Sequence, residues 1–262
     1  MAIQTKINKQ QVWKIYKYAP YVASWRYIEL CAAKDVLSRN NIDEENVLDL
    51  GCGSGELTGV IFDTVAAGID LQYTEIQKAR KHAEYKELFV ADATKIGVKR
   101  EKFDLLFSNS VIEHIPDQEN LWREITRVVK KKGFIIVTVP TTHFIPYSFF
   151  LVKKIFPKKC QEWEGRINKS IKHYHYFNVE RFQNIARENN LCIVDYQCYG
   201  GKWLTAVTNI LLRTYQLRIG KTETGFKIHK ILAAVMRSIL YFMTKYQRRK
   251  EGSGLAILLR RE

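Results

Sequence analysis

The chain of 262 residues has the length of one ordinary domain, and 46% of its residues are hydrophobic, enough to bury a core. Its 26% charged residues fit a folded protein rather than a disordered one, and its 14 glycines and 5 prolines exclude collagen-like and low-complexity architectures. The 42 Lys and Arg against 27 Asp and Glu give a formal net charge of +15, which favours an anionic partner such as nucleic acid, acidic lipid or a phosphorylated substrate.

Short apolar runs alternate with amphipathic segments over the first half of the chain. Residues 8–40 are predicted to be helical, with aromatic side chains interspersed among Lys and Arg. The predicted buried strands are residues 46–50, 64–70, 88–92, 103–108 and 133–139, and the helices between them are predicted at residues 56–62, 74–85 and 120–129. This alternation predicts a parallel sheet with helices on both faces.

The pattern changes after the fifth predicted strand. Residues 141–176 form a long connection rich in aromatics, Lys and His, which is unusual in a compact domain unless it is functional. A helix at 178–189, a strand at 191–196, two or three helices over 203–250 and a last strand at 254–260 are predicted to follow. We therefore expect one domain over 1–262, with an N-terminal helical lid (1–44), a cofactor-binding core (45–142), a substrate-side insertion (143–177) and a C-terminal half (178–262) that carries a helical cap at about 203–250.

A glycine-rich loop after the first predicted strand carries the strongest functional signal. Gly51, Gly53 and Gly55 follow a GxGxG spacing, and glycines let a ligand approach where a Cβ atom would collide. Asp70 stands 19 residues after Gly51, at the end of the next predicted strand, where a carboxylate can bind both hydroxyls of a ribose. A pyrophosphate would be repelled by these acids, so a cationic nucleoside is favoured. A tight turn without a ligand, with Asp70 as a helix cap, is the alternative.

The same segments resemble the class I S-adenosylmethionine-dependent methyltransferases, in particular the methyltransferase type 11-like group. The resemblance covers roughly residues 45–142, and its motifs occur in the family's order at residues 49–55, 69–70, 91–93, 103–104, 108–114 and 129–133. It implies an α/β fold with a Rossmann-like seven-stranded, mostly parallel sheet and helices on both faces. It also implies an antiparallel last strand, which accounts for the apolar run at 254–260.

The resemblance further implies which residues contact S-adenosylmethionine. These residues are Asp49, Gly51, Cys52, Gly53, Gly55, Asp70, Leu71, Asp92, Ala93 and Asn109. By this resemblance the glycine loop approaches the methionine part, Asp70 binds the ribose, Asp92 with Ala93 faces the adenine and Asn109 closes the methionine side. Cys52 is more readily interpreted as a small packing residue than as a nucleophile, and Asp92 as a solvated loop acid is the alternative to a binding role.

Methyl transfer from a sulfonium is an in-line displacement, which depends on positioning and needs no metal. A hydroxyl acceptor benefits from a general base, and the candidates are His114 and His143, with His173 and His175 as a second group. Some quinone-pathway O-methyltransferases resemble this stretch but carry Glu-x-x-Glu-His, which they use with a divalent metal. Ser110 replaces the first Glu here, so we expect no metal site. The alternatives are a helix cap at His114, a surface loop at His143 and packed strand residues at 173–177.

The acceptor is constrained mainly by what the chain lacks. The Asn/Asp-Pro-Pro-aromatic motif of enzymes that methylate amino groups of bases is absent, because residues 108–111 read Ser-Asn-Ser-Val. A nucleophilic cysteine for cytosine methylation is also absent near the fourth and fifth predicted strands. We therefore favour an oxygen acceptor on a sugar, quinone or lipid-linked molecule. An RNA methyltransferase, suggested by the net charge, and a non-catalytic S-adenosylmethionine-binding protein are the alternatives.

The positive charge is concentrated at the C-terminal end. Residues 201–262 hold 13 Lys and Arg against three acids, a net charge of +10. They include an apolar run at 231–244 that is followed by basic residues at 245–250, and residues 144–159 show a similar pattern. An apolar helix beside basic residues suits an anionic membrane surface. Packing as a cap with a solvated basic face is the alternative.

The cysteines and the N-terminus bear on the compartment. The five cysteines are scattered without a CxxC pair, which argues against a zinc site or a disulfide framework and favours reduced thiols. The first residues lack the apolar run of a signal peptide, and no stretch reaches the ~18 uncharged residues of a spanning helix. We therefore expect a cytoplasmic protein, with peripheral association at the inner face of the membrane as a further expectation.

Overall fold

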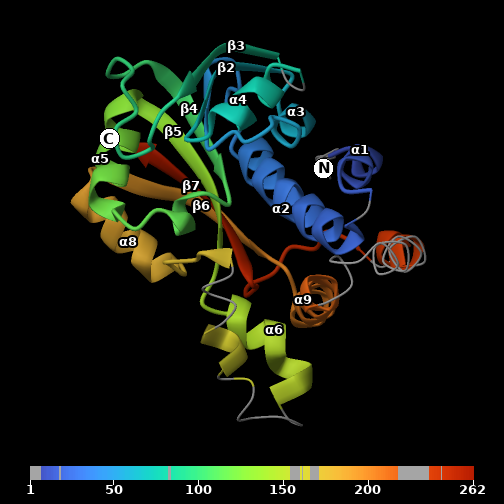
Figure 1. Cartoon of the computed structure of the whole chain (residues 1–262). Coiled ribbons are helices and arrows are strands. Elements are labelled where there is room, and N and C mark those ends of the chain that lie inside the picture. The colour runs from blue at the N-terminus through green and yellow to red at the C-terminus, as the bar shows by residue number, and fades with distance from the viewer. Residues whose placement is uncertain are drawn as a thin grey trace.

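The structure, a computed structural model of the chain, describes residues 7–17, 19–81, 84–153, 160, 162–165, 171–217, 236–242 and 244–262. Within these ranges seven strands form one sheet in the order β3-β2-β1-β4-β5-β7-β6, and β7 runs antiparallel to both neighbours (Figure 1). The strands are β1 (Val47–Leu50), β2 (Thr64–Asp70), β3 (Glu84–Val90), β4 (Phe103–Asn109), β5 (Val129–Pro140), β6 (Leu191–Tyr199) and β7 (Gly254–Arg261). The predicted Rossmann-like, mostly parallel sheet is confirmed.

Helices cover both faces of this sheet (Figure 1). The named helical elements are α1 (Lys9–Ile15), α2 (Pro20–Arg39), α3 (Thr58–Ile61), α4 (Tyr73–Ala79), the 3₁₀ turn η1 (Ile112–His114), α5 (Gln118–Val128), α6 (Phe144–Lys153), α8 (Val179–Glu188) and α9 (Lys202–Leu217), of which α6 lies below the sheet beside α9. α5 and α8 bury Leu121 and Phe182 against one face, together with Leu48 of β1. The neighbouring Val47 points to the opposite face and packs with α2, as the two-residue period of a strand requires.

α2 is a structural layer of the core. Its Leu30, Ala33, Val36 and Leu37 are fully buried against the sheet, and the small side chains let the helix lie close to the strands. Residues 1–44, predicted to be a lid, thus contain a helix that the fold needs for its core. The lid role itself stays a prediction, as do the predicted boundaries between lid, core and cap.

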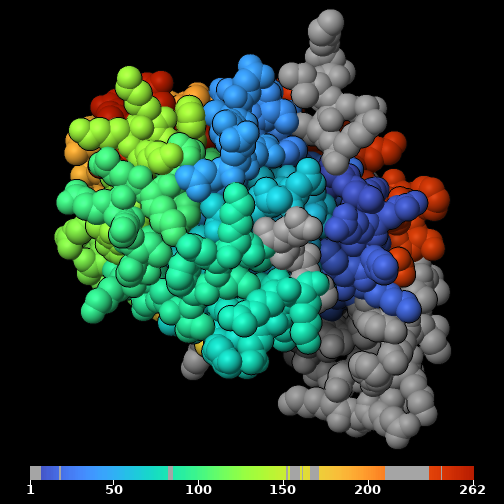
Figure 2. All heavy atoms as spheres, turned by 90° about the horizontal axis from the view of Figure 1, so that it is seen from above, coloured from blue at the N-terminus to red at the C-terminus, as the bar shows by residue number. Residues whose placement is uncertain are grey.

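α1 attaches the N-terminal end to the described part of the C-terminal segment. Lys9 Nζ donates hydrogen bonds to the carbonyl oxygens of Tyr241 and Thr244, and Trp13 contacts the Tyr241 ring edge-on with centroids 5.3 Å apart. Figure 2 shows the dark blue N-terminal helices beside the orange-red residues near the C-terminus. α1 and the residues Tyr241 and Thr244, far apart in the sequence, are therefore neighbours in space, whereas the C-terminal end of β7 lies beside α5 (Figure 1).

Two predicted boundaries in the first half are wrong. The single helix predicted at 8–40 is two helices, because Pro20 has no N–H to continue a helix and instead begins α2. The third strand begins at Glu84, inside the helix predicted at 74–85. β3 is an edge strand with exposed Lys86 and Glu87, and this charged pattern resembles that of an amphipathic helix.

The second half also departs from expectation. The connection predicted at 141–176 contains α6, whose start is stabilised by Thr141 Oγ1 accepting from the backbone N–H of His143 at 3.1 Å. In the predicted cap, α9 and residues 236–242 are helical, whereas residues 218–235 and 243 lie outside the described residues, as does part of the apolar run at 231–244. Within the described ranges, every helix is too short or too polar to cross a bilayer.

Candidate functional site

A cleft of about 530 Å³ opens at the carboxyl ends of β1, β2, β3 and β4. Parallel strands bring their ends to one edge of the sheet, so residues distant in sequence gather there. The cleft is lined by Leu50, Gly51, Ile69, Asp70, Leu71, Gln72, Ala91, Asp92, Ala93, Thr94, Val111, His114, Ile115, Pro116 and Asp117. Of the predicted cofactor residues, the structure thus brings together Gly51, Asp70, Leu71, Asp92 and Ala93.

Asp70 is oriented by backbone donors on both sides. The N–H of Gly53 donates to Oδ2 at 2.9 Å, and the N–H of Gln72 donates to Oδ1 at 2.8 Å. Each carboxylate oxygen can accept more than one hydrogen bond, so Asp70 keeps acceptor capacity toward the cleft. A fixed carboxylate of this kind fits the two hydroxyls of a ribose.

Asp92 is held in a similar way one strand further out. The backbone N–H and the hydroxyl of Thr94 both donate to Asp92 Oδ1, at 2.8 and 2.7 Å. Its Oδ2 makes no hydrogen bond to the described residues. The side chain therefore faces the cleft with an acceptor that suits an amino group such as that of adenine.

The glycine loop needs glycine on steric grounds. Gly51 has φ +77°, and a Cβ atom there would lie 2.4 Å from Cγ2 of Val111. Gly53 has φ +52°, and the space where its Cβ would stand is open. Open space above a bare backbone is what a bound nucleoside and amino-acid moiety requires, so the residues present fit S-adenosylmethionine.

The charge of the cleft also fits a cationic ligand. Its wall carries the carboxylates of Asp70, Asp92 and Asp117, and the lining includes neither Lys nor Arg. In a protein with a net charge of +15, this local excess of acid disfavours a phosphate-bearing ligand. Asp117, Thr94, Ile115 and Pro116 were not among the predicted residues; their position just after β3 and β4 is the signal that could have found them.

The remaining predicted cofactor residues lie outside the cleft wall. Asp49 is buried and accepts from the hydroxyls of Thr58 and Tyr85, each at 2.6 Å, and burial raises its pKa to about 6. Cys52 packs against Ile76 of α4. Tyr85 lies 2.9 Å from where a Cβ of Gly55 would stand. Asp49 and Cys52 therefore support the glycine loop from the side that faces away from the cleft.

Asn109 and His143 also point elsewhere. Asn109 Oδ1 accepts from the Thr138 hydroxyl at 2.8 Å. The His143 ring stacks on Tyr147 at 5.2 Å between centroids. His143 is part neither of the wall of the cleft nor of the wall of a second cavity that adjoins the cleft. These contacts therefore place neither residue in the wall of the cleft.

A second cavity, of about 190 Å³, adjoins the cleft, and we call it the acceptor cavity. Its lining comes from α2, η1, α6, α9, the end of β5, and residues 110, 171 and 173. The lining residues are Tyr21, Val22, Trp25, Arg26, Ser110, Glu113, His114, Pro140, Phe144, Ile171, His173, Thr208 and Asn209. His114 belongs to the walls of both the cleft and the acceptor cavity, so it stands where the two spaces meet.

His114 is arranged as a proton acceptor. Its Nδ1 lies 3.0 Å from the carbonyl oxygen of Lys172, which can only accept, so Nδ1 carries the proton and Nε2 the lone pair. Burial lowers the pKa of His114, and the positive charge of Arg26 lowers it further against the opposing effect of the Lys172 carbonyl. The imidazole is therefore neutral at physiological pH.

The buried Glu113 and the half-buried His173 lie beside His114, and each has a buried side-chain atom that is unsatisfied. Burial raises the pKa of Glu113 to about 8 and lowers that of His173 to about 3, so both are neutral at pH 7. Glu113 Oε2 and His173 Nδ1 have no hydrogen-bond partner among the described residues, which costs ~1–3 kcal/mol for each such atom. Two such atoms in one cavity wall indicate a place where a polar ligand group completes the hydrogen bonding.

The same three side chains have the spacing of a metal site. Their ligand atoms lie within 4.8 Å of one another in Glu113, His114 and His173. The absence of a metal, predicted from Ser110, therefore stays a prediction. His175 lies apart from the three, with its Nε2 3.3 Å from the carbonyl oxygen of Pro116.

A buried carboxylate that sequence reasoning missed organises the acceptor cavity. Glu29 Oε1 accepts from the hydroxyls of Ser110 at 2.6 Å and Tyr199 at 2.9 Å, and Glu29 Oε2 pairs with Arg26 at 2.5 Å. α2 is thereby tied to the ends of β4 and β6. The i,i+3 spacing of Arg26 and Glu29 within a helical segment is the sequence signal for this pair.

Comparisons with known proteins agree with this geometry. A family model described as a methyltransferase domain matches residues 42–201. A demethylmenaquinone methyltransferase of Lactococcus lactis is 24% identical over 245 residues, 83% of this chain and 97% of the relative. A ubiquinone biosynthesis O-methyltransferase of Histophilus somni is 26% identical over 183 residues, 63% of this chain and 74% of the relative. A solved SAM-dependent methyltransferase of Thermotoga maritima shares the fold, with a TM-score of 0.59 and 16% identity over 98% of each chain.

Proposed function

Because the chain belongs to the family of methyltransferase domains and uses S-adenosylmethionine, we propose that it methylates an oxygen atom of a small or lipid-linked molecule in the acceptor cavity. The observation that carries this proposal is the position of His114. One neutral imidazole borders both the cofactor cleft and the acceptor cavity, with its basic nitrogen left free by the Lys172 carbonyl.

The chain's own residues supply positioning and proton transfer. Bound S-adenosylmethionine contributes a methyl group activated by a positively charged sulfur. With the cofactor bound, His114 Nε2 would accept the proton of the acceptor hydroxyl as its oxygen takes the methyl group, and S-adenosylhomocysteine would be the second product. Neutral Glu113 and His173 offer hydrogen bonds to the acceptor's polar groups without placing a negative charge beside the reacting oxygen.

The acceptor cavity favours an aromatic ring. Trp25 and Phe144 meet edge-to-face with centroids 5.7 Å apart, and Tyr21 and Pro140 extend this apolar wall. A dry cavity of about 150 Å³ can accept benzene, so about 190 Å³ suits one substituted ring whose larger substituents extend outside. A phenol or quinol fits this description, and two relatives named for menaquinone and ubiquinone reactions support the same class.

RNA methylation is the second candidate, favoured by the net charge of +15. Its weakness is the small, aromatic acceptor cavity, which is walled by four separate helices or turns. A scaffold that binds S-adenosylmethionine without catalysis would leave the free lone pair of His114 without a role.

The proposal is tested by product analysis. The purified chain is incubated with methyl-labelled S-adenosylmethionine and, separately, a catechol or hydroquinone, a free sugar, and total RNA. We expect the label as a methyl ether on the phenolic oxygen, identified by mass spectrometry. Label on carbon, nitrogen or RNA would replace the proposed acceptor, and calorimetric binding of the cofactor without turnover on any acceptor would favour the scaffold.

A further inference from the structure

A groove of about 480 Å³ lies on the far side of α9 from the acceptor cavity and is lined by several cations. We call this groove the basic groove. Its lining residues are Ile28, Tyr199, Gly200, Gly201, Lys202, Trp203, Leu204, Val207, Leu240, Lys245, Tyr246, Gln247 and Arg249. We infer that the basic groove and its apolar rim dock this protein on a bilayer that contains anionic lipids. The inference goes beyond the proposed function and does not depend on the identity of the acceptor.

The cations of the basic groove lack acidic partners among the described residues. Lys202, Lys245 and Arg249 are exposed, and the described part of the chain places no carboxylate within ion-pair distance of them. The lining itself contains no Asp or Glu. Three unpaired positive charges around one hollow repel each other and attract an anionic surface.

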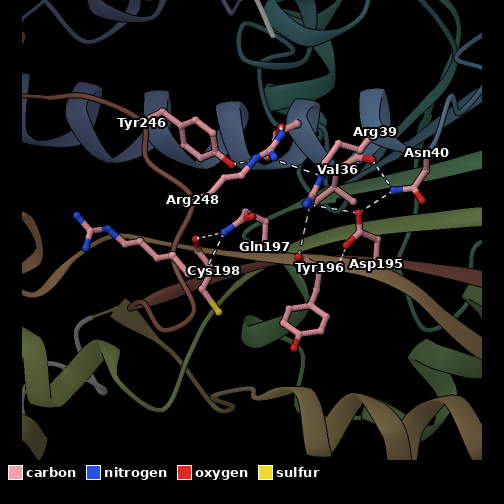
Figure 3. A network of polar contacts seen from close by, with 11 residues as sticks. Val36, Arg39, Asn40, Asp195, Tyr196, Gln197, Cys198, Tyr246 and Arg248 are labelled. Carbon is pink, nitrogen blue, oxygen red and sulfur yellow. Dashed lines mark hydrogen bonds and ion pairs between the residues drawn. The ribbon is translucent and has the colours of Figure 1, made fainter. Parts of the chain in front are cut away.

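The neighbouring Arg248 shows the contrast. Its Nη2 and Nε donate to the two carboxylate oxygens of Asp35, at 2.6 and 2.8 Å, and Tyr246 OH donates to the same carboxylate at 2.9 Å. Figure 3 shows Tyr246 and Arg248 reaching toward α2 in this network. Arg248 therefore attaches residues 246–249 to α2, whereas Arg249 lines the basic groove.

The segment that carries the groove cations is held in place. Gln197 Nε2 donates to the carbonyl oxygen of Arg249 at 2.9 Å, and Cys198 forms a β-bridge with Arg249 (Figure 3 labels Gln197 and Cys198). The guanidinium of Arg249 lies over Gly201, where a Cβ atom would stand 2.6 Å from Cζ. A positioned cation loses less entropy on binding than a free one.

Exposed apolar side chains lie in the lining of the basic groove (Trp203) and on the helical residues 236–242, whose Leu240 belongs to that lining (Ile239 and Phe242). Trp203 is 66% exposed, and Phe242 and Ile239, on the helical residues 236–242, are 76% and 46% exposed. Trp203 also contacts Phe150 edge-on at 4.8 Å, with Lys202 over the same Phe150 ring. Cations with Trp, Phe and Ile at their edge suit the interface of a bilayer, where the headgroups take the charge and the acyl boundary takes the apolar groups. An RNA partner would gain little binding energy from contact with the aliphatic side chain of Ile239.

The large groove between α5 and α8 does not share these features. It has a volume of about 990 Å³ and is lined by several arginines. Its Arg123 pairs with Glu119 at 2.7 Å, and its Arg261 pairs with Glu101 at 3.1 Å. With Arg127 bound to Glu124, three of its five arginines form ion pairs, whereas all three cations of the basic groove lack one among the described residues. The basic groove is therefore the better anionic docking surface.

Vesicle flotation tests the inference without any methyl transfer. The full chain is mixed with vesicles of phosphatidylcholine alone or with 30% phosphatidylglycerol, a composition chosen as about a third anionic lipid. We expect binding to the anionic vesicles only, and at least ~10-fold weaker binding of the triple variant K202E/K245E/R249E. The matched control K86E/K99E/K131E makes the same change in net charge at exposed lysines outside the groove and should retain binding.

Two readouts keep the test decisive. Calorimetric binding of S-adenosylmethionine must be unchanged in both triple variants, which shows that they fold, and W203A should weaken vesicle binding at unchanged net charge. Equal binding of the wild type to both vesicles, or equal loss in the two triple variants, would overturn the inference. Groove-dependent binding of RNA without vesicle binding would overturn it in favour of a nucleic-acid surface. None of these outcomes depends on which acceptor is methylated.

Discussion

The cofactor cleft and the acceptor cavity share one wall residue, His114, yet they are built in different ways. The cleft is lined by residues 50–117, all at or just after the ends of neighbouring parallel strands. The acceptor cavity combines side chains between Tyr21 and Asn209 from both ends of the fold. The first depends on local motifs on one sheet edge, and the second depends on how distant helices pack.

The two spaces also differ in how their polar groups are satisfied. In the cleft, Asp70 and Asp92 already accept hydrogen bonds from N–H and O–H donors in the loops at the strand ends. In the acceptor cavity, the buried Glu113 and the half-buried His173 each have a buried atom without a hydrogen-bond partner among the described residues, and both have shifted pKa values. A pre-organised acidic cleft is suited to binding the cofactor, whereas neutral groups with shifted pKa values are suited to proton transfer.

The largest expected effect is at the shared wall. His114→Gln should lower kcat by ~10²–10⁴-fold, because it removes the proton acceptor, while leaving the cofactor dissociation constant nearly unchanged. Because the pKa of His114 is lowered, the wild-type activity should be lost only below pH ~6.5, as His114 takes up a proton. Steady-state rates across pH and calorimetry measure both effects.

His143→Gln is the comparison variant for the base. It removes the second histidine predicted from the sequence, whose ring stacks on Tyr147 away from the acceptor cavity. We expect near-normal kcat for this variant. A reversed result, with His143→Gln inactive and His114→Gln active, would assign the general base to His143, just before α6, and would refute the role of His114.

The next effect concerns the unusual acid of the acceptor cavity. Burial raises the pKa of Glu113 to about 8 in the folded chain, above its unfolded value near ~4.3. Folding favours the protonated form of Glu113. The stability linked to this preference is fully present below pH ~4.3 and is lost as the pH rises through about 8. Glu113→Gln should remove roughly 2–4 kcal/mol of this pH dependence.

Urea unfolding at several pH values between 5 and 9 measures the pH dependence of the free energy of unfolding. The wild type is compared with variants that replace a single glutamate by glutamine. Glu119, whose side chain is 84% exposed, provides the control as Glu119→Gln, which should leave the pH dependence as in the wild type. An unchanged slope in Glu113→Gln would mean that Glu113 is ionised or solvated, and the acceptor cavity would lose its distinctive chemistry.

A third effect tests the cleft alone. Asp70→Ala should weaken S-adenosylmethionine binding by about 10–100-fold, because charge-assisted hydrogen bonds of about 1.5–3 kcal/mol are lost. Asp63→Ala is the matched control, since the exposed Asp63 precedes β2 at its opposite end. Calorimetry that found equal affinities for the two variants would refute the role of Asp70.

The contrast explains what the sequence could predict. The seven-stranded sheet, the family and the cofactor are confirmed, and Asp70 and Asp92 could be placed because each follows an apolar strand of one parallel sheet. Arg26, Glu29 and Thr208 could not, because nothing in a helical pattern tells which polar side chain faces a distant strand end. Long-range packing decides that, and local spacing does not record it.

The smallest expected effect shows how far the cleft depends on residues behind it. Tyr85 OH donates to the buried Asp49 at 2.6 Å, and Tyr85→Phe removes one of the two hydroxyl donors that stabilise this carboxylate. We expect a loss of about 1–2 kcal/mol in the free energy of unfolding and a further rise in the pKa of Asp49, since the lost hydrogen bond favours the ionised form. Tyr73→Phe, at a ring that is 62% exposed, should change stability by less than ~0.5 kcal/mol. If Tyr85→Phe weakened cofactor binding as much as Asp70→Ala did, the loop at 51–55 would owe its shape to Asp49 and Tyr85, and the cleft would then rest on long-range packing just as the acceptor cavity does.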